Sequence, residues 1–240
     1  MMGNIMMPRA KKLGKGLLIS FEGGEGAGKS TQIRHLEAFL KSHGFKVLIT
    51  LEPGGSTIGK GIRGVLLNPD NKELSHRAEL LLYEADRAQH MDEVVFPALE
   101  KGVIVLSDRG QDSSTVYQGL CRGFGKALVE KMNQFATNHT VPDLTFIFDL
   151  DEKLGRSRVR ERLLRDAKLH GIRRRVKLDR LEREKLAFHQ KVRKGFLKLA
   201  REDKKRFKII DASGEIPVIQ SKIESIAIEL LVRKKLWQNR

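Results

Sequence analysis

A glycine-rich loop constrains this chain more than any other stretch. Residues 23–30 read Gly-Gly-Glu-Gly-Ala-Gly-Lys-Ser and match the pattern G-x-x-x-x-G-K-[S/T]. An apolar run over residues 16–21 precedes the loop, and residues 31–42 follow it with apolar side chains at helical spacing. In this setting, backbone N–H groups and the N-terminus of the helix face a phosphate group. The loop therefore predicts a phosphate-binding site, the alternative being a glycine-rich turn that contains a lysine by chance.

The loop predicts ATP as one ligand. Lys29 is expected to reach the β- and γ-phosphates, and the Ser30 hydroxyl is expected to ligate Mg²⁺. The expected ATP contacts are Gly23, Gly24, Glu25, Gly26, Ala27, Gly28, Lys29, Ser30 and Thr31.

Strand-like and helix-like stretches alternate along the chain. Strands are expected at 45–50, 103–106, 144–149 and 207–211, in addition to 16–21. Helices are expected at 58–67, 75–99, 111–118, 126–138, 151–165, 179–203 and 216–233. The continuous apolar run at 103–106 suits a parallel strand that is covered on both faces. We expect an α/β fold of the three-layer P-loop NTPase type, with a five-stranded parallel sheet and helices on both faces.

The 240 residues suit one domain, expected at 16–233, between a flexible basic N-terminal tail at 1–15 and a short C-terminal tail at 234–240. No apolar run approaches the length that spans a bilayer, and the N-terminal residues lack the features of a signal peptide. The single cysteine, Cys121, excludes an internal disulfide and suits a reducing compartment. We therefore expect a cytoplasmic protein without a membrane partner.

Positive charge is concentrated in one segment. The formal net charge is +16, and residues 156–208 contain 22 lysines and arginines against 7 aspartates and glutamates, a balance of +15. Such a segment can bind nucleic acid, an acidic membrane surface or a polyphosphate, or it can be a solvated face.

Further motifs follow the loop in a fixed order. They are Glu-Pro-Gly-Gly at 52–55, Asp-Arg-Ala-Gln-His at 86–90, Asp-Arg at 108–109, Tyr-Gln-Gly at 117–119 and Leu-Asp-Arg at 178–180. From about residue 16 to residue 231, this series resembles the bacterial type of thymidylate kinase. The resemblance implies Mg²⁺-dependent transfer of the γ-phosphoryl group of ATP to dTMP, which gives dTDP. It also implies a homodimer and no nucleic-acid partner.

The resemblance implies roles for individual residues. Arg109 would hold the acceptor phosphate, with Asp108 near Mg²⁺ and the attacking oxygen, and Glu25 would face the sugar. The expected dTMP-binding residues are Glu25, Tyr83, Arg87, Arg109, Ser113, Tyr117 and Gln118. Within this set, Tyr83 would stack on thymine and Arg87 would donate to a base carbonyl. The expected catalytic residues are Lys29, Asp108, Arg109 and Arg158, and the expected metal ligands are Ser30 and Asp108.

The loop contains no basic residue between Gly24 and Ala27, so the resemblance implies a catalytic arginine on a lid at about 156–178. The candidates are Arg156, Arg158, Arg160 and Arg162. Arg158 and Arg162 are four residues apart and share a helix face, and Arg158 is favoured. Residues 163–177 are longer than the corresponding part of the family's usual lid and predict a mobile insertion.

Three positions depart from the family pattern: Leu51 replaces an arginine, Tyr83 a phenylalanine, and Gly110 an aromatic residue or histidine. Two other functions remain open, namely a P-loop ATPase that binds nucleic acid and a kinase of similar fold for another nucleotide. The strand ending Asp108-Arg109 suits an anionic acceptor better than the Asp-Glu ending expected of an ATPase. The seven histidines show no metal-ligand spacing with one another or with Cys121.

Overall fold

The computed structural model of the chain describes residues 16–169 and 178–237. Its sheet has five parallel strands in the order β2-β3-β1-β4-β5. The strands are β1 (Leu17–Gly23), β2 (Val47–Leu51), β3 (Ile104–Asp108), β4 (Leu144–Asp149) and β5 (Phe207–Asp211). The predicted α/β fold with a five-stranded parallel sheet is therefore confirmed.

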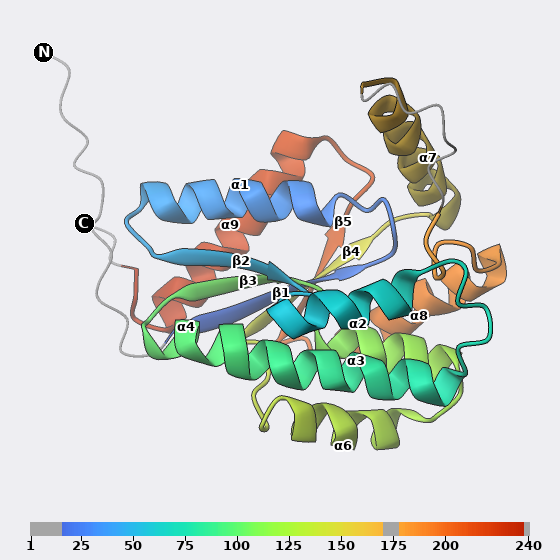
Figure 1. Ribbon diagram of the computed structural model, residues 1–240. Coiled ribbons are helices and arrows are strands. Elements are labelled where there is room, and N and C mark those ends of the chain that lie inside the picture. Colours follow the sequence, from blue (N-terminus) through green and yellow to red (C-terminus); the bar gives the residue numbers. More distant parts are fainter. Residues whose placement is uncertain (1–15, 170–177, 238–240) are drawn as a thin grey trace, which may run out of the picture.

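Helices cover both faces of the sheet and complete three layers (Figure 1). One face carries α1 (Lys29–Ser42) and α9 (Ile216–Arg233). The other carries helical segments that pack on the sheet or on one another: α2 (Thr57–Leu67), α3 (His76–His90), η1 (Met91–Val95), α4 (Phe96–Glu100), α5 (Gln111–Ser114), η2 (Thr115–Cys121), α6 (Lys126–Ala136) and α8 (Leu186–Glu202). Helix α7 (Glu152–Leu169) follows β4 and stands at the edge of the molecule.

Alternate residues of the central strand pack into different layers. Leu17, Ile19 and Phe21 join the core beneath α1 and α9, whereas Leu18 packs with Met91 and Val105 on the other side. The rings of Phe21 and Phe146 lie 5.3 Å apart between centroids, inside the first of these cores. Because both faces of the strands are covered, their sequences are continuously apolar rather than alternating.

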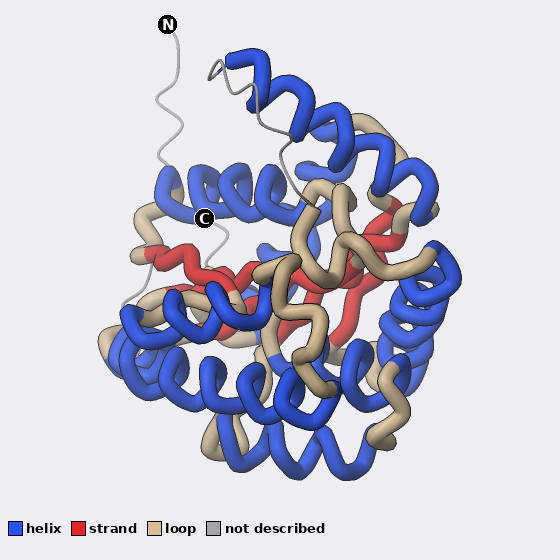
Figure 2. The backbone as a smooth tube through the Cα atoms, turned by 45° about the vertical axis from the view of Figure 1, so that its right-hand side comes forward, coloured by secondary structure: helices blue, strands red, loops and turns tan. Residues whose placement is uncertain are grey.

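The strand order reverses at β1, which pairs with β3 on one side and β4 on the other. A crevice at the carboxyl ends of the strands is expected at such a switch point. Figure 2 brings this edge forward and shows the loops crossing in front of the strands, with α7 rising beside them. The motifs that follow β1, β2 and β3 in the sequence therefore meet at one edge.

One predicted helix begins later than expected. The sequence predicted a helix over 179–203, but α8 begins at Leu186. The side chains of Asp179 and Glu182 accept hydrogen bonds from each other's backbone N–H groups, at 2.7 and 2.9 Å, and close a separate turn. Arg180 fixes this turn to the end of α2 by donating to the Leu66 and Leu67 carbonyls. Tertiary contacts thus override the helical pattern of these residues.

The helix predicted over 75–99 is interrupted. Ser75 caps it as expected, because its hydroxyl accepts from the Ala78 N–H, but residues Met91–Val95 form a π-helical turn before α4. Pro97 lies in the first turn of α4 and cannot donate to the preceding turn, which accounts for the wider turn at this point. The helix predicted at 111–118 is α5 followed by a second π-helical segment, Thr115–Cys121, which runs three residues past the expected end.

The lid helix packs tightly against the phosphate loop at its base. A Cβ atom on Gly26 would lie 2.2 Å from the Gly155 carbonyl oxygen, and one on Gly155 would lie 2.5 Å from the Glu25 carbonyl oxygen. Both positions therefore require glycine. The predicted insertion at 163–177 overlaps the end of α7, and residues 170–177, like the predicted tail at 1–15, lie outside the described residues.

The chain after α9 packs back onto the domain. Trp237 stacks on Phe39 and Phe45, with ring centroids 6.1 and 6.2 Å away, and the Leu236 N–H donates to the Leu231 carbonyl at 2.8 Å. Residues 234–237 were assigned to a tail from the sequence. Their packing adds an aromatic contact to the core beneath α1, and the outer boundary of the domain stays a prediction.

We expect Trp237→Ala to lower the free energy of unfolding by about 1–3 kcal/mol, because Trp237 is half-buried against two aromatic rings. Chemical denaturation measures the change. Val232→Ala, at an exposed position of α9, is the control and should change stability by less than about 0.5 kcal/mol. Equal stability of the two variants would contradict a stabilising role for Trp237.

Candidate functional site

The phosphate loop lies between β1 and α1, as the sequence predicts. Gly28 is the N-cap residue of α1 with φ 84°, and no side chain caps this helix end. Lys29 is 7% exposed, and its Nζ donates to the carbonyls of Gly23 and Gly24 at 3.2 and 2.9 Å. Burial, and then the positive charge of Arg109, lower the pKa of Lys29. The N-terminus of α1, which no side chain caps, and the ammonium group of Lys29 can therefore both bind an anion.

A serine and an aspartate meet beside this loop. The Ser30 hydroxyl donates to Asp108 Oδ2 at 2.7 Å, and this pair is open to solvent. A hydroxyl and a carboxylate oxygen are ligands that suit Mg²⁺. The two predicted metal ligands therefore lie in contact, although they come from α1 and β3.

One large cavity, of about 450 Å³, joins the phosphate loop to the ends of β2 and β3. Of the predicted ATP contacts, Glu25, Gly26, Ala27, Gly28, Lys29, Ser30 and Thr31 line it; Gly23 and Gly24 do not. All seven predicted dTMP-binding residues line it: Glu25, Tyr83, Arg87, Arg109, Ser113, Tyr117 and Gln118. Asp108, Arg158 and Arg162 also line it. The structure thus brings the predicted donor and acceptor sites into one space.

Arg109 occupies the centre of this cavity in an uncommon backbone conformation, with φ 73°. Its N–H donates to the Phe21 carbonyl at 2.9 Å, and the Ser107 hydroxyl donates to its carbonyl at 2.7 Å. The guanidinium pairs with Glu25 and lies 5.5 Å from the centre of the Tyr117 ring. A non-glycine residue held in the left-handed region beside a cavity is typical of functional sites.

Opposite effects act on the carboxyl of Glu25. Burial raises its pKa, but the charges of Arg109 and Lys29 outweigh burial and lower the pKa to about 2. Glu25 is therefore ionised at neutral pH and balances one of the two cations in the cavity.

A second glutamate, Glu22, was not singled out from the sequence. It is fully buried and accepts hydrogen bonds from the N–H groups of Gly110 and Ser113, at 2.9 and 3.2 Å, and from the Ser113 hydroxyl at 2.6 Å. Burial raises the pKa of Glu22 to about 8, against the opposing effect of Arg109. Glu22 fixes the turn that presents Arg109 and Ser113, and its place inside an apolar strand gave no sign of this role.

Arg87 lines the cavity but is only 1% exposed, and protein groups surround its guanidinium. Its acceptors are Glu52 at 2.9 Å, Glu84 at 2.8 Å, Asn133 at 2.9 Å, Ser114 at 3.1 Å and the Gly110 carbonyl at 3.2 Å. Glu84, Ser114 and Asn133 are contacts that the sequence analysis missed. The predicted contact of Arg87 with a base carbonyl stays a prediction.

The Asp-Arg-Ala-Gln-His motif of α3 holds the Glu-Pro-Gly-Gly loop in place. Glu52 pairs with Arg87 and accepts from His90 Nδ1 at 2.9 Å, whereas His90 Nε2 lies 2.6 Å from the Thr50 hydroxyl. Asp86 accepts from the Gly54 N–H at 2.9 Å. The two motifs are therefore one structural unit that forms a wall of the cavity.

Tyr83 and Gln118 both line the cavity, but they differ in exposure and in hydrogen bonding. Tyr83 is half-buried, and burial together with Glu79 raises the pKa of its hydroxyl. Gln118 is 1% exposed and donates to Glu79 at 2.8 Å. Glu79 is fully buried and also accepts from Arg122 and Arg180, which fixes the turn after the lid to α3.

The lid arginines separate into two groups. Arg158 is half-buried, lines the cavity and donates to the Ala212 carbonyl at 3.0 Å, and Arg162 lies 3.9 Å from Glu182. Arg160 is exposed and does not line the large cavity, and Arg156 borders a smaller cavity. Of the four candidates, the pair spaced by four residues lines the large cavity, as helix geometry predicts, and Arg165, one turn further along the helix, lines it as well.

We expect Glu22→Gln to flatten the dependence of stability on pH between about 5 and 8. The native pKa of Glu22 lies above its ordinary value of 4.5, so the native state binds more protons than the unfolded state in this range. The wild-type chain should therefore lose stability as pH rises, by at most about 1.4 kcal/mol per pH unit from this group. Denaturation at several pH values measures the slope.

Glu229→Gln, an exposed position on α9, is the control and should leave the slope unchanged. Parallel curves for the wild-type chain and Glu22→Gln would contradict a raised pKa at Glu22.

The chain is similar to thymidylate kinases over most of its length. A family model described as thymidylate kinase matches residues 21–223. The chain is 45% identical over 198 residues to a thymidylate kinase of Desulfosudis oleivorans, covering 82% of this chain and 90% of that protein. It is 43% identical over 220 residues to a thymidylate kinase of Geobacillus thermodenitrificans, covering 92% and 93%.

A solved structure has the same fold. The crystal structure of thymidylate kinase from Ehrlichia chaffeensis matches with a TM-score of 0.69 and 25% identity, over 89% of this chain and 99% of that chain. In the described residues, no helix is both long and apolar enough to cross a membrane.

Proposed function

The chain belongs to the thymidylate kinase family. On this premise we propose that the large cavity binds ATP and dTMP together, and that the enzyme transfers the γ-phosphoryl group of ATP to dTMP there, giving dTDP. The observation that carries the proposal is the meeting of the phosphate loop with Arg109, Glu25 and Tyr117 in one cavity. Phosphoryl transfer requires two polyanions held in line and little covalent chemistry from the protein. A single cavity with cations on two walls provides this arrangement.

The ATP phosphates bind to the loop at residues 23–30 and to the first turn of α1. Lys29 exchanges its contacts with the Gly23 and Gly24 carbonyls for the phosphate oxygens that it neutralises. Ser30 and Asp108 would hold Mg²⁺, which supplies positive charge against the phosphate oxygens.

The acceptor binds on the opposite wall. Arg109 holds the phosphate of dTMP, and Ser113 lies within 3.3 Å of the Arg109 Nη1 atom. Glu25 accepts from the sugar hydroxyl, Tyr117 closes the space beside the sugar, and Tyr83 stacks on the base. Arg87 and Gln118 border the base. The positions of all these residues on one cavity support the assignment.

Substrate selectivity tests the proposal against a kinase for another nucleotide. We expect dTMP to be the best acceptor with ATP, and dUMP to have a kcat/KM lower by roughly 10–200-fold, the usual effect of one methyl group in an apolar pocket. The 2′-hydroxylated analogue of dTMP should react poorly, because Tyr117 is buried beside the sugar. A coupled assay with a panel of nucleoside monophosphates measures these ratios, and comparable use of purine monophosphates would contradict the proposal.

We propose Arg158 as the lid arginine that stabilises the transferred phosphoryl group. It already lines the cavity, and its partner, the Ala212 carbonyl, lies at the end of β5. Closure of α7 over bound ATP would also exclude water from the reaction.

Arg158→Ala is expected to lower kcat by about 10³-fold or more, the scale of an arginine that contacts a transferred phosphoryl group. Arg160→Ala is the matched control, because it removes the same side chain from an exposed position two residues away. Single-turnover and steady-state kinetics measure both variants. Equal effects of the two substitutions would exclude Arg158 from this role.

We also propose a cytoplasmic homodimer. The outer helices α2, α3 and α6 pack in series, and each exposes apolar side chains; examples are Ile58, Leu81 and Phe135, the last 87% exposed. An exposed apolar surface of this kind marks an interaction site. The kinase assignment does not call for a nucleic-acid partner, and the basic lid is assigned to ATP.

A further inference from the structure

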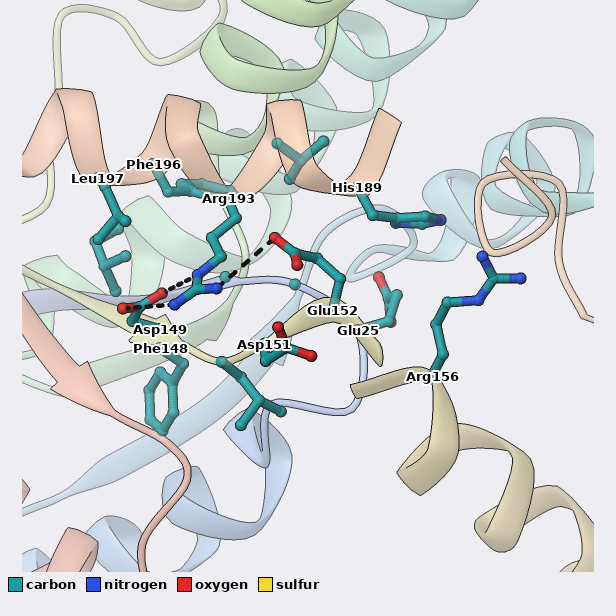
Figure 3. Close-up of a pocket in the computed structure, with 15 residues that line it drawn as sticks. Glu25, Phe148, Asp149, Asp151, Glu152, Arg156, His189, Arg193, Phe196 and Leu197 are labelled. Carbon is teal, nitrogen blue, oxygen red and sulfur yellow. Dashed lines mark hydrogen bonds and ion pairs between the residues drawn. The ribbon is translucent and has the colours of Figure 1, made fainter. Parts of the chain in front are cut away.

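A second, small cavity of about 30 Å³ lies behind the phosphate loop, between β4, α7 and α8. Its lining includes Gly23, Gly24 and Glu25 from the loop, Arg156 from α7 and His189 from α8. Glu25 lines this cavity and the large one, so its side chain forms part of the wall between them. Figure 3 shows His189 reaching from α8 and Arg156 from α7 toward the side where Glu25 lies.

The charged groups on the other side of the small cavity satisfy one another. Arg193 donates to both carboxylate oxygens of Asp149, and its Nη1 lies 4.0 Å from Glu152 (Figure 3). Arg193, Asp149 and Glu152 therefore have one another as partners. The ring of His189 has one nitrogen atom, Nε2, without a partner among the described residues.

His189 is nine-tenths buried, and its Nε2 atom has no hydrogen-bond partner in the described part of the chain. A buried polar atom without a partner destabilises the fold, so this atom needs one. A cavity of this size holds one water molecule, which needs polar neighbours. His189 and Glu25 both line this cavity, and each side chain affects the pKa of the other, so the two are close enough to share a water molecule.

The imidazole of His189 is neutral at pH 7. Burial, followed by the positive charge of Arg156, lowers its pKa, and the nearby carboxylate of Glu25 opposes them. A neutral ring carries one N–H group and one lone pair, and a water molecule can pair with either. Both tautomers of His189 are therefore compatible with a bridging water.

We propose that His189 is a positioning residue for Glu25, which it holds through one water molecule in the small cavity. One oxygen of Glu25 pairs with Arg109, and the other is directed toward the sugar hydroxyl of the acceptor. The inference rests on the proposed function, because it assigns Glu25 to the sugar of dTMP.

Glu25 needs such a support because it is not fixed by packing. Its side chain is 32% exposed, and Arg109 gives it one strong contact on the side of the large cavity. His189, by contrast, sits on a rigid helix face: Val192 and Phe196 of α8 are buried in the core, and the Phe188 ring packs edge-on at 6.0 Å. Holding a flexible carboxylate in one orientation before substrate binds lowers the entropic cost of binding.

The test compares two acceptors, dTMP and 3′-deoxythymidine monophosphate, which lacks the sugar hydroxyl. His189→Phe removes Nε2 and keeps an aromatic ring in place. We expect the KM for dTMP to rise about tenfold, with the KM for the 3′-deoxy acceptor and for ATP changed less than twofold. His189→Gln, which restores a polar end, should recover most of the dTMP affinity.

His76→Phe, at an exposed histidine of α3, is the matched control and should leave all three constants unchanged. Thermal melting of each variant separates loss of affinity from loss of folding, and His189→Gln provides the comparison if His189→Phe does not fold. Equal effects of a folded His189 variant on both acceptors, or no effect on either, would overturn the inference. Failure of the wild-type chain to phosphorylate dTMP would instead overturn the proposed function.

Discussion

The site depends on the pairing of Arg109 with Glu25 in the phosphate loop. Arg109 and Lys29 are two neighbouring cations: burial, and then the positive charge of Arg109, lower the pKa of Lys29. Glu25 pairs directly with Arg109, and Glu22 lies 3.9 Å from it. The ionised carboxylate of Glu25 keeps the two cations together in the absence of polyanions, whereas Glu22, whose pKa is raised to about 8, holds the adjoining turn through hydrogen bonds. A phosphate group can then replace Glu25 as the partner of Arg109 without any large movement of the cations.

The same arrangement explains why the backbone of Arg109 stays in the left-handed region. Glu22 binds the N–H groups of Gly110 and Ser113, while Phe21 and Ser107 bind the backbone of Arg109 itself. Asp112, in the same turn, pairs with Arg206 at 2.6 and 3.0 Å, and Arg206 stands just before β5. Contacts from β1, from β3 and from the residue before β5 thus hold one turn, and their sum outweighs the roughly 1–3 kcal/mol cost of its conformation.

The sequence predicts the frame of the site better than its supporting contacts. Local patterns predict the phosphate loop and the strand ends. They also predict that Arg158 and Arg162 share a helix face, because glycine spacing and helical periodicity involve residues close in the sequence. The roles of Glu22 and His189 were missed, since each is buried by residues distant in the sequence. Glu84 was also missed, although its partner Arg87 lies only three residues further along α3, a spacing that brings two side chains together on a helix. The late start of α8 has the same origin, because Arg180 binds carbonyls that belong to α2.

The departures from the family pattern fall on a wall whose backbone other residues fix. Arg87, His90 and Asp86 hold the Glu-Pro-Gly-Gly loop from behind, so Leu51 can replace an arginine without moving that loop. Gly110 has an extended backbone that any residue can adopt, and a Cβ atom there would meet only the Ser20 Cβ, at 4.0 Å. Glycine at this position therefore creates space rather than a turn. The wall beside Arg109 is thus less charged and roomier than the family pattern implies, whereas the placement of Arg109 does not depend on either substitution.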